Sequence, residues 1–95
     1  MIELIEVIRN DEAGNFFLRK IYVNPGKIVK MVGNLKLQSS LNEGKMPKDL
    51  DKRTEFTTIS LDHGYGVEVV VIGSVTEVQN KILNERKILH GADAH

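Results

Sequence analysis

The sequence contains no cysteine, which excludes disulfide bonds, thiolate zinc sites and cysteine nucleophiles. It also lacks a charge excess of either sign, because 13 lysine and arginine residues balance 13 aspartate and glutamate residues. Proteins that grip nucleic acid through its phosphates usually carry a basic excess, so a formal net charge of zero argues against that class. The same neutrality removes one barrier to self-association.

Long hydrophobic runs are also missing. The apolar stretch from Val69 to Ile72 is far too short to span a bilayer, and residues 1–6 carry acids where a signal peptide carries bases. We therefore expect a cytoplasmic protein, or one in the host cytoplasm if a phage encodes it. Its 95 residues predict a single domain spanning 1–95. Because so small a domain buries only about 60–70% of its unfolded surface, a homo-oligomer is favoured.

Five segments are rich in β-branched and aromatic residues and are bounded by turn residues. They predict strands over residues 1–9, 16–23, 27–32, 56–61 and 67–72. The first is apolar on both faces, which is usual for a strand covered on both, and a neighbouring subunit is one source of the second cover. In the third, strict alternation places Ile28 with Val32 on one face. Val29 and Met31 then share the opposite face.

The connections between these strands carry turn residues. Asn24-Pro25-Gly26 predicts a type II turn, in which Pro25 presets its own φ and Gly26 takes a positive φ. Residues 62–66 predict a tight glycine-rich turn. Residues 34–55 read as an insertion between the third and fourth strands, with a short helix over 35–43 and then a charged loop. We expect that loop to be solvated, and residues 45–53 to be removable without loss of the fold.

A helix is predicted to follow the last strand. Ser74 and Glu77 have the spacing of a capping box, in which each side chain satisfies a backbone N–H at the start of a helix. An apolar stripe continues along one side of this helix at Val75, Val78, Ile82 and Leu89. The whole pattern predicts a mainly β fold, α+β at the margin: a small five-stranded antiparallel β-barrel or curved sheet with a C-terminal α-helix.

Several short motifs resemble the small FlbD-like proteins of flagellar and swarming clusters and similar uncharacterised phage proteins. These motifs are Met1-Ile2-Glu3-Leu4, Val23-Asn24-Pro25, Thr58-Ile59-Ser60-Leu61, Gly66, Val69, Val71 and Ser74-Val75-Thr76-Glu77-Val78. The resemblance covers residues 1–32 and 57–89 and implies an Sm-like or SH3-like small barrel. It rests on turn, strand and cap residues, so it brings no catalytic or ligand-binding residue to this chain.

Residues suited to chemistry are few and scattered. His63, His90 and His95 show neither the H-x-x-x-H nor the H-E-x-x-H spacing of a metal site. Ser60 and Asp62 lie near His63, but no strained nucleophile turn of the G-x-S-x-G kind is present. We therefore predict no enzyme activity, no catalytic, metal or cofactor-binding residues, and no cofactor.

Two groups of residues are candidates for contact with a partner. Lys48, Lys52 and Arg53 lie in the charged loop, where interleaved acids offset their field, and Lys27 and Lys30 are candidates to extend it. The second group lies in the predicted turn at residues 62–66. It consists of His63 and Tyr65.

Three functional classes follow, and the sequence does not choose a biological role among them. The favoured class is a non-enzymatic, self-associating structural or protein-interaction module. The first alternative is a small-barrel RNA- or DNA-binding protein, which requires a continuous basic surface. The second is a ligand binder whose site forms between subunits, which requires a concave pocket with converging polar groups.

Overall fold

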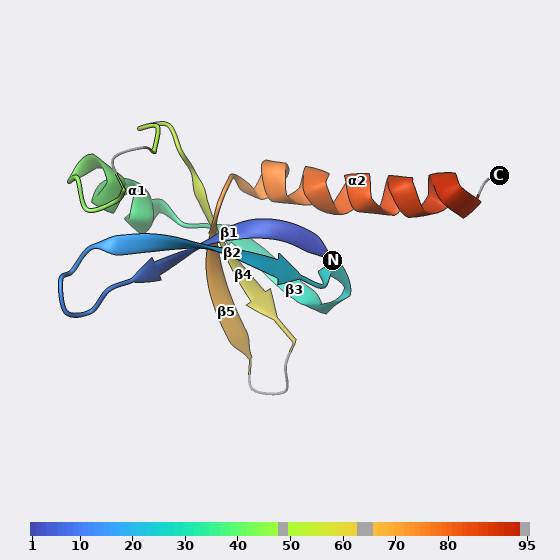
Figure 1. The fold of residues 1–95 in the computed structure, drawn as a ribbon, viewed down its shortest axis with the longest axis horizontal. Coiled ribbons are helices and arrows are strands. Elements are labelled where there is room, and N and C mark those ends of the chain that lie inside the picture. The colour runs from blue at the N-terminus through green and yellow to red at the C-terminus, as the bar shows by residue number, and fades with distance from the viewer. Residues whose placement is uncertain (48–49, 63–65, 94–95) are drawn as a thin grey trace.

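Five antiparallel strands form one sheet in the order β2-β1-β5-β4-β3 in the computed structural model (Figure 1). The structure describes residues 1–47, 50–62 and 66–93, with the side chains of α2 described as far as Glu85. The strands are β1 (Ile2–Arg9), β2 (Phe16–Val23), β3 (Ile28–Gly33), β4 (Phe56–Leu61) and β5 (Val67–Ile72). The helices are η1 (Pro25–Lys27, a 3-10 turn), α1 (Leu35–Asn42) and α2 (Val75–Asp93). The predicted mainly β architecture with a C-terminal helix is confirmed.

The sheet is curved and open. The β1–β2 hairpin crosses the β4–β5 hairpin, so the two run in different directions in Figure 1. Where β1 and β5 meet, Glu6 is aligned with Val71. Among the described residues β2 and β3 pair only with their single inner neighbours, so both are edge strands. Of the two predicted architectures, the curved sheet forms and the closed barrel does not.

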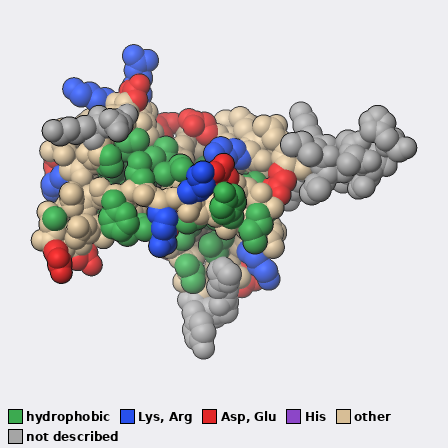
Figure 2. Space-filling view, viewed as in Figure 1, with side chains coloured by type: hydrophobic (Ala, Val, Ile, Leu, Met, Phe, Trp, Pro, Cys, Tyr) green, Lys and Arg blue, Asp and Glu red, His purple; other side chains and the backbone are tan. Residues whose placement is uncertain are grey.

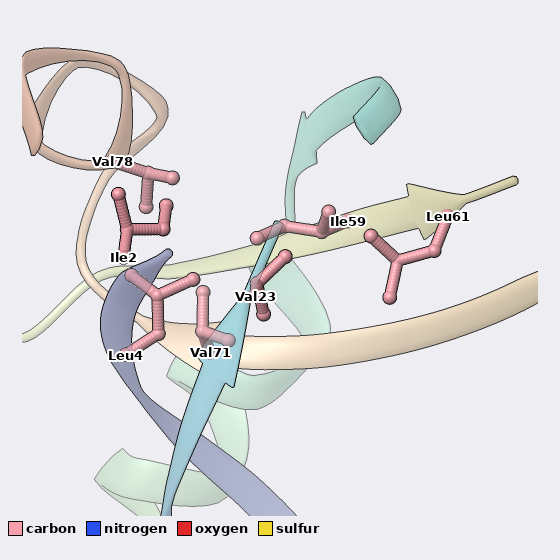
Figure 3. Close-up of a cluster of buried hydrophobic side chains, with 7 residues drawn as sticks. All are labelled: Ile2, Leu4, Val23, Ile59, Leu61, Val71 and Val78. Atoms are coloured by element: carbon pink, nitrogen blue, oxygen red, sulfur yellow. The ribbon is translucent and has the colours of Figure 1, made fainter. Parts of the chain in front are cut away.

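One face of the sheet, the α2 face, packs against the start of α2. Figure 3 shows side chains from β1, β2, β4 and β5 converging there with Val78 of the helix. The buried members of this core are Ile2, Leu4, Val23, Ile59, Leu61, Val71 and Val78. Burying each such side chain contributes about 1.5–3 kcal/mol. Ile82 packs against the same core one helical turn after Val78, which confirms these two positions of the predicted stripe. Val75 is half-buried and does not belong to this core, and the side chain of Leu89 lies outside the described residues.

The opposite face, the α1 face, has a second core. Its buried members are Val7, Leu37, Leu41, Met46 and Phe56. Side chains from both faces of β1 are therefore buried within one chain. On the α1 face this chain itself supplies the cover for which a neighbouring subunit was one predicted source. The prediction of a wholly solvated loop after α1 is wrong, because Met46 is buried and Leu50 packs against this core.

A change of register in β3 overturns its predicted faces. Ile28 pairs with Leu61 and Lys30 with Ser60, so the strand carries one extra residue in a β-bulge between Ile28 and Lys30. Ile28 and Met31 consequently both pack against the α2-face core, although strict alternation assigns them to opposite faces. The bulge cannot be seen in the residue pattern, because it depends on how β3 pairs with β4.

The turn before β3 also differs from the prediction. Residues 25–27 form a 3-10 turn, and Gly26 is not among the glycines with positive φ. The side chain of Asn24 accepts a hydrogen bond from the N–H of Gly26 at 2.9 Å. This bond stabilises a turn with negative φ, so the type II turn is not formed.

Both predicted helix starts are confirmed. Asn34 Oδ1 accepts from the N–H of Leu37 at 3.2 Å, and Ser74 Oγ accepts from the N–H of Glu77 at 3.1 Å. Such caps contribute about 1 kcal/mol each, because they satisfy N–H groups that the helix leaves without a partner. At the other end of α1, Gly44 follows with φ of 78°, which suits a glycine after a helix.

Helix α2 gives the molecule its elongated shape. Its 19 residues span about 28 Å, and Figure 1 shows the helix projecting past the sheet. The radius of gyration is 14.8 Å, whereas a compact domain of 95 residues has about 12 Å. None of the helices in the described part of the chain has both the length and the apolarity needed to cross a membrane.

Candidate interaction surface

The structure describes two of the five predicted contact residues. Lys52 and Arg53 are both exposed, just before β4. Lys48, His63 and Tyr65 lie outside the described residues. The two groups of candidates belong to opposite ends of β4, because residue 53 precedes the strand and residue 63 follows it.

Arg53 lies beside carboxylates instead of other cations. Its backbone N–H donates to the Oδ1 of Asp51 at 2.8 Å. It also lines a shallow groove of about 260 Å³ together with Asp51, Glu55 and Glu77. Three acidic side chains against one arginine make this groove unsuited to an anion such as a nucleic-acid phosphate.

The predicted extension of the basic patch is not formed. Lys27 lies beside the end of β4, since its carbonyl accepts from the N–H of Asp62 at 2.8 Å. Lys52 and Arg53 precede the start of the same six-residue strand, about 20 Å away. The pairing of β3 with β4 therefore separates these cations.

Cations of the β1–β2 hairpin are paired with carboxylates. Arg19 Nη2 lies 2.6 Å from Glu6 Oε1, and Lys20 Nζ lies 2.9 Å from Glu3 Oε1. The hydrogen bond and the charge of Glu3 raise the pKa of Lys20 above its usual value. On the face shown in Figure 2, lysine and arginine side chains are scattered among acidic and hydrophobic ones. In the described part of this face, the cations do not form the continuous basic surface that phosphate binding requires.

The outer edge of β2 has no strand beside it in the part of the chain that the structure describes. Because the N–H of Phe16 donates to the carbonyl of Lys45 at 3.1 Å, the even-numbered residues of β2 direct their backbone groups away from β1. Those further along the edge are Leu18, Lys20 and Tyr22. Arg19 and Lys20 lie at the middle of this edge, and charged side chains there discourage pairing with another strand.

The outer edge of β3 is more apolar. The N–H of Asn34 donates to the carbonyl of Phe56 at 2.8 Å, so the even-numbered residues at this end of β3 direct their backbone groups toward β4. Met31 and Gly33 alternate with those residues and therefore direct their N–H and C=O groups away from β4. Three exposed aliphatic side chains lie along this edge: Val29 (70% exposed), Val32 (50%) and Leu35 (75%). They define the β3 edge surface.

A further groove of about 340 Å³ runs between α1 and the start of α2. Asn34, Gln38, Glu55, Ser74 and Thr76 contribute its polar lining. The side chains of Asn34 and Ser74 already cap the two helices, so they serve the fold. Across the described ranges, no group of three histidine, aspartate or glutamate side chains is placed to hold a metal ion.

The β3 edge surface is the feature that sequence reasoning missed. Alternation places Val29 on the same face as Met31, which packs against the core, and the bulge that separates them is visible only once the register is known. The signal that could have pointed to it is the spacing of Val29, Val32 and Leu35, each three residues apart. A comparison with known protein families, curated proteins and solved structures finds no match, and the FlbD-like resemblance stays a prediction.

Proposed function

We propose that this domain is a non-enzymatic module that works by joining copies of itself through an open edge of its sheet. The observation that carries the proposal is the gathering of exposed apolar side chains on the two edge strands. These side chains are Phe17 and Tyr22 on β2 and Val29 and Val32 on β3, together with Leu35 at the start of α1.

An open edge suits association because its outward N–H and C=O groups can form hydrogen bonds with a further strand. Adding a strand satisfies those groups and removes the neighbouring apolar side chains from water. The zero formal charge of the chain leaves little overall repulsion between copies. Backbone pairing and apolar burial therefore act together at the same place.

Nucleic-acid binding is less well supported. Arg19 and Lys20 are each held by a glutamate of β1, and Arg53 lies among three carboxylates. A surface of this kind offers few cations whose counterions a nucleic acid would release on binding. The interaction-module proposal does not depend on any cation.

Sedimentation equilibrium of the full chain over a wide range of concentrations tests the proposal. We expect the average molar mass to rise from one chain toward a multiple of it as the concentration increases. Binding of the same samples to single-stranded and duplex oligonucleotides is measured at low and high salt. A molar mass of one chain at every concentration refutes the proposal, and so does salt-dependent oligonucleotide binding by a chain that stays monomeric.

A further inference from the structure

The three aliphatic side chains of the β3 edge surface are symmetrically spaced about the middle one. Val29 and Leu35 each lie three residues from Val32. When a strand pairs antiparallel with its own copy, a two-fold axis relates the residues of one strand to those of the other. An axis at Val32 places it beside Val32 of the second copy. By residue count, Val29 in the bulge then falls at the same level as Leu35 of the second copy, the first residue of its α1.

The same axis also pairs the outward backbone groups of one copy with those of the other. It aligns Met31 with Gly33 of the second copy, and these are the residues whose N–H and C=O groups point outward. Each such pair then exchanges both of its N–H···O bonds. The backbone remains extended through Asn34, with φ of −107° and ψ of 96°, so the pairing geometry reaches the residue before Leu35.

Open space at Gly33 favours the close approach of a second strand. Gly33 is exposed, and no atom lies within 4 Å of the position that a Cβ would occupy. The bulge of β3 lies before Lys30, which leaves the stretch from Lys30 to Gly33 in regular register. A bulge disrupts pairing locally, so its position at the start of the strand preserves the part that the axis requires.

The placement of charged residues distinguishes the β3 edge from the β2 edge. With the axis at Val32, Lys30 faces Asn34 of the second copy, and no cation of β3 faces its own counterpart. An axis at the middle of β2 instead sets Arg19 or Lys20 directly against the same residue of the second copy. Like charges directly opposite in a ladder are destabilising, so self-pairing is favoured at β3 and disfavoured at β2.

We infer that two copies of this domain join through β3 in an antiparallel pair whose two-fold axis passes through Val32. The inference rests on the proposed self-association and specifies its interface. The pair continues the sheet from one copy into the next and covers the β3 edge surface of both. Phe17 and Tyr22 on β2 stay outside this interface.

A single-cysteine crosslink tests the position of the axis, because the chain has no cysteine of its own. Val32 and its counterpart form a non-hydrogen-bonded pair, with Cα atoms about 4.5 Å apart, a distance that a disulfide spans. We expect Val32→Cys to give a covalent dimer under mild oxidation. Val29→Cys is the matched control, since its side chain is more exposed yet lies about 20 Å from its counterpart in this register.

Charge substitution provides a second, reversible test. Val32→Glu and Val32→Lys each set a charge against the same charge at the axis, and each should raise the dissociation constant by roughly a hundredfold or more. Mixing the two variants should restore the dimer as a mixed pair. Leu83→Glu on α2, which likewise replaces an exposed aliphatic side chain by a charged one, should leave association unchanged.

The outcomes separate the interface from the self-association. A wild-type dimer that survives Val32→Glu, or that crosslinks through Val29→Cys as fast as through Val32→Cys, overturns the β3 axis and leaves the self-association intact. A wild-type chain that stays monomeric at every concentration overturns both. Crosslinking at Val32 together with restoration in the Val32→Glu and Val32→Lys mixture supports both.

Discussion

The buried hydroxyl of Thr57 donates a hydrogen bond to the carbonyl of Gly73 at 2.8 Å. Thr57 lies in β4 and is fully buried, and Gly73 lies in the connection between β5 and α2. The N–H of Gly73 in turn donates to the carbonyl of Glu55 at 2.8 Å. The start of α2 is thus held to the sheet by polar contacts as well as by the packing of Val78.

Replacing Thr57 by valine tests the hydroxyl alone, because the two side chains have nearly the same shape. We expect Thr57→Val to lower the free energy of unfolding by about 1–3 kcal/mol, since the buried carbonyl of Gly73 loses its donor. Urea denaturation measures this loss. Thr76→Val, on the exposed side of α2, should change stability by no more than about 0.5 kcal/mol. Equal stability of Thr57→Val and the wild type would show that the hydrogen bond is not needed.

Gly73 has φ of 119°, which side-chain-bearing residues rarely adopt. A Cβ there meets its nearest atom, Glu77 Oε2, at 3.6 Å, so the penalty of a side chain is backbone strain rather than a clash. We expect Gly73→Ala to cost about 1–3 kcal/mol in denaturation experiments. Gly33→Ala, compared at the same low protein concentration, should cost almost nothing. A Gly73→Ala protein as stable as the control would argue against the observed turn.

The residue pattern predicts the elements of this fold better than their arrangement. Strand positions and both helix caps follow from local chemistry, because β-branched runs and cap side chains act over a few residues. The 3-10 turn at residues 25–27 and the bulge of β3 do not follow, since one depends on the rotamer of Asn24 and the other on pairing with β4. Strand order also depends on long-range packing that periodicity does not encode.

Met46 shows how composition misled the interpretation of the segment after α1. The many charges around it predict solvent, yet its own side chain is buried in the α1-face core. We expect Met46→Ala to lower stability by about 2–4 kcal/mol, through lost burial and the cavity left behind. Leu83→Ala, at an exposed position, should have a much smaller effect.

Deleting residues 45–53 removes Met46 and Leu50 from the α1-face core, so it should weaken cooperative unfolding. A deletion variant that still unfolds cooperatively would show that the loop is dispensable.

Lys20 gives the stability a defined alkaline dependence. Its pKa in the folded protein is raised above 10.5 by the hydrogen bond and the charge of Glu3. The contribution of this pair is fully present below pH 10.5 and is lost as the pH rises through the higher folded pKa. We expect the stability difference between the wild type and Lys20→Met to shrink in strongly alkaline solution. A difference that stays constant there would show that Glu3 does not hold the lysine.

The candidate interaction surface could be predicted only in part from the sequence. The expectation of self-association rests on the small size and neutral charge of the chain, and those properties do not locate an interface. Lys52 and Arg53 attract attention as a cluster of cations, and the structure instead sets Arg53 among carboxylates. Val32 does not stand out in the sequence, because an aliphatic residue in a strand is usually in the core. Only the edge position of β3 makes it a candidate contact residue.

Amide hydrogen exchange followed by NMR at increasing protein concentration tests the central claim most directly. The N–H groups of Met31 and Gly33 point outward from β3 and should exchange fast in the monomer. We predict that they become protected as the concentration rises, while those of Leu18, Lys20 and Tyr22 on β2 stay fast. Protection that appears on β2 instead, or fast exchange of Met31 and Gly33 at concentrations where the chain is dimeric, would contradict pairing through β3.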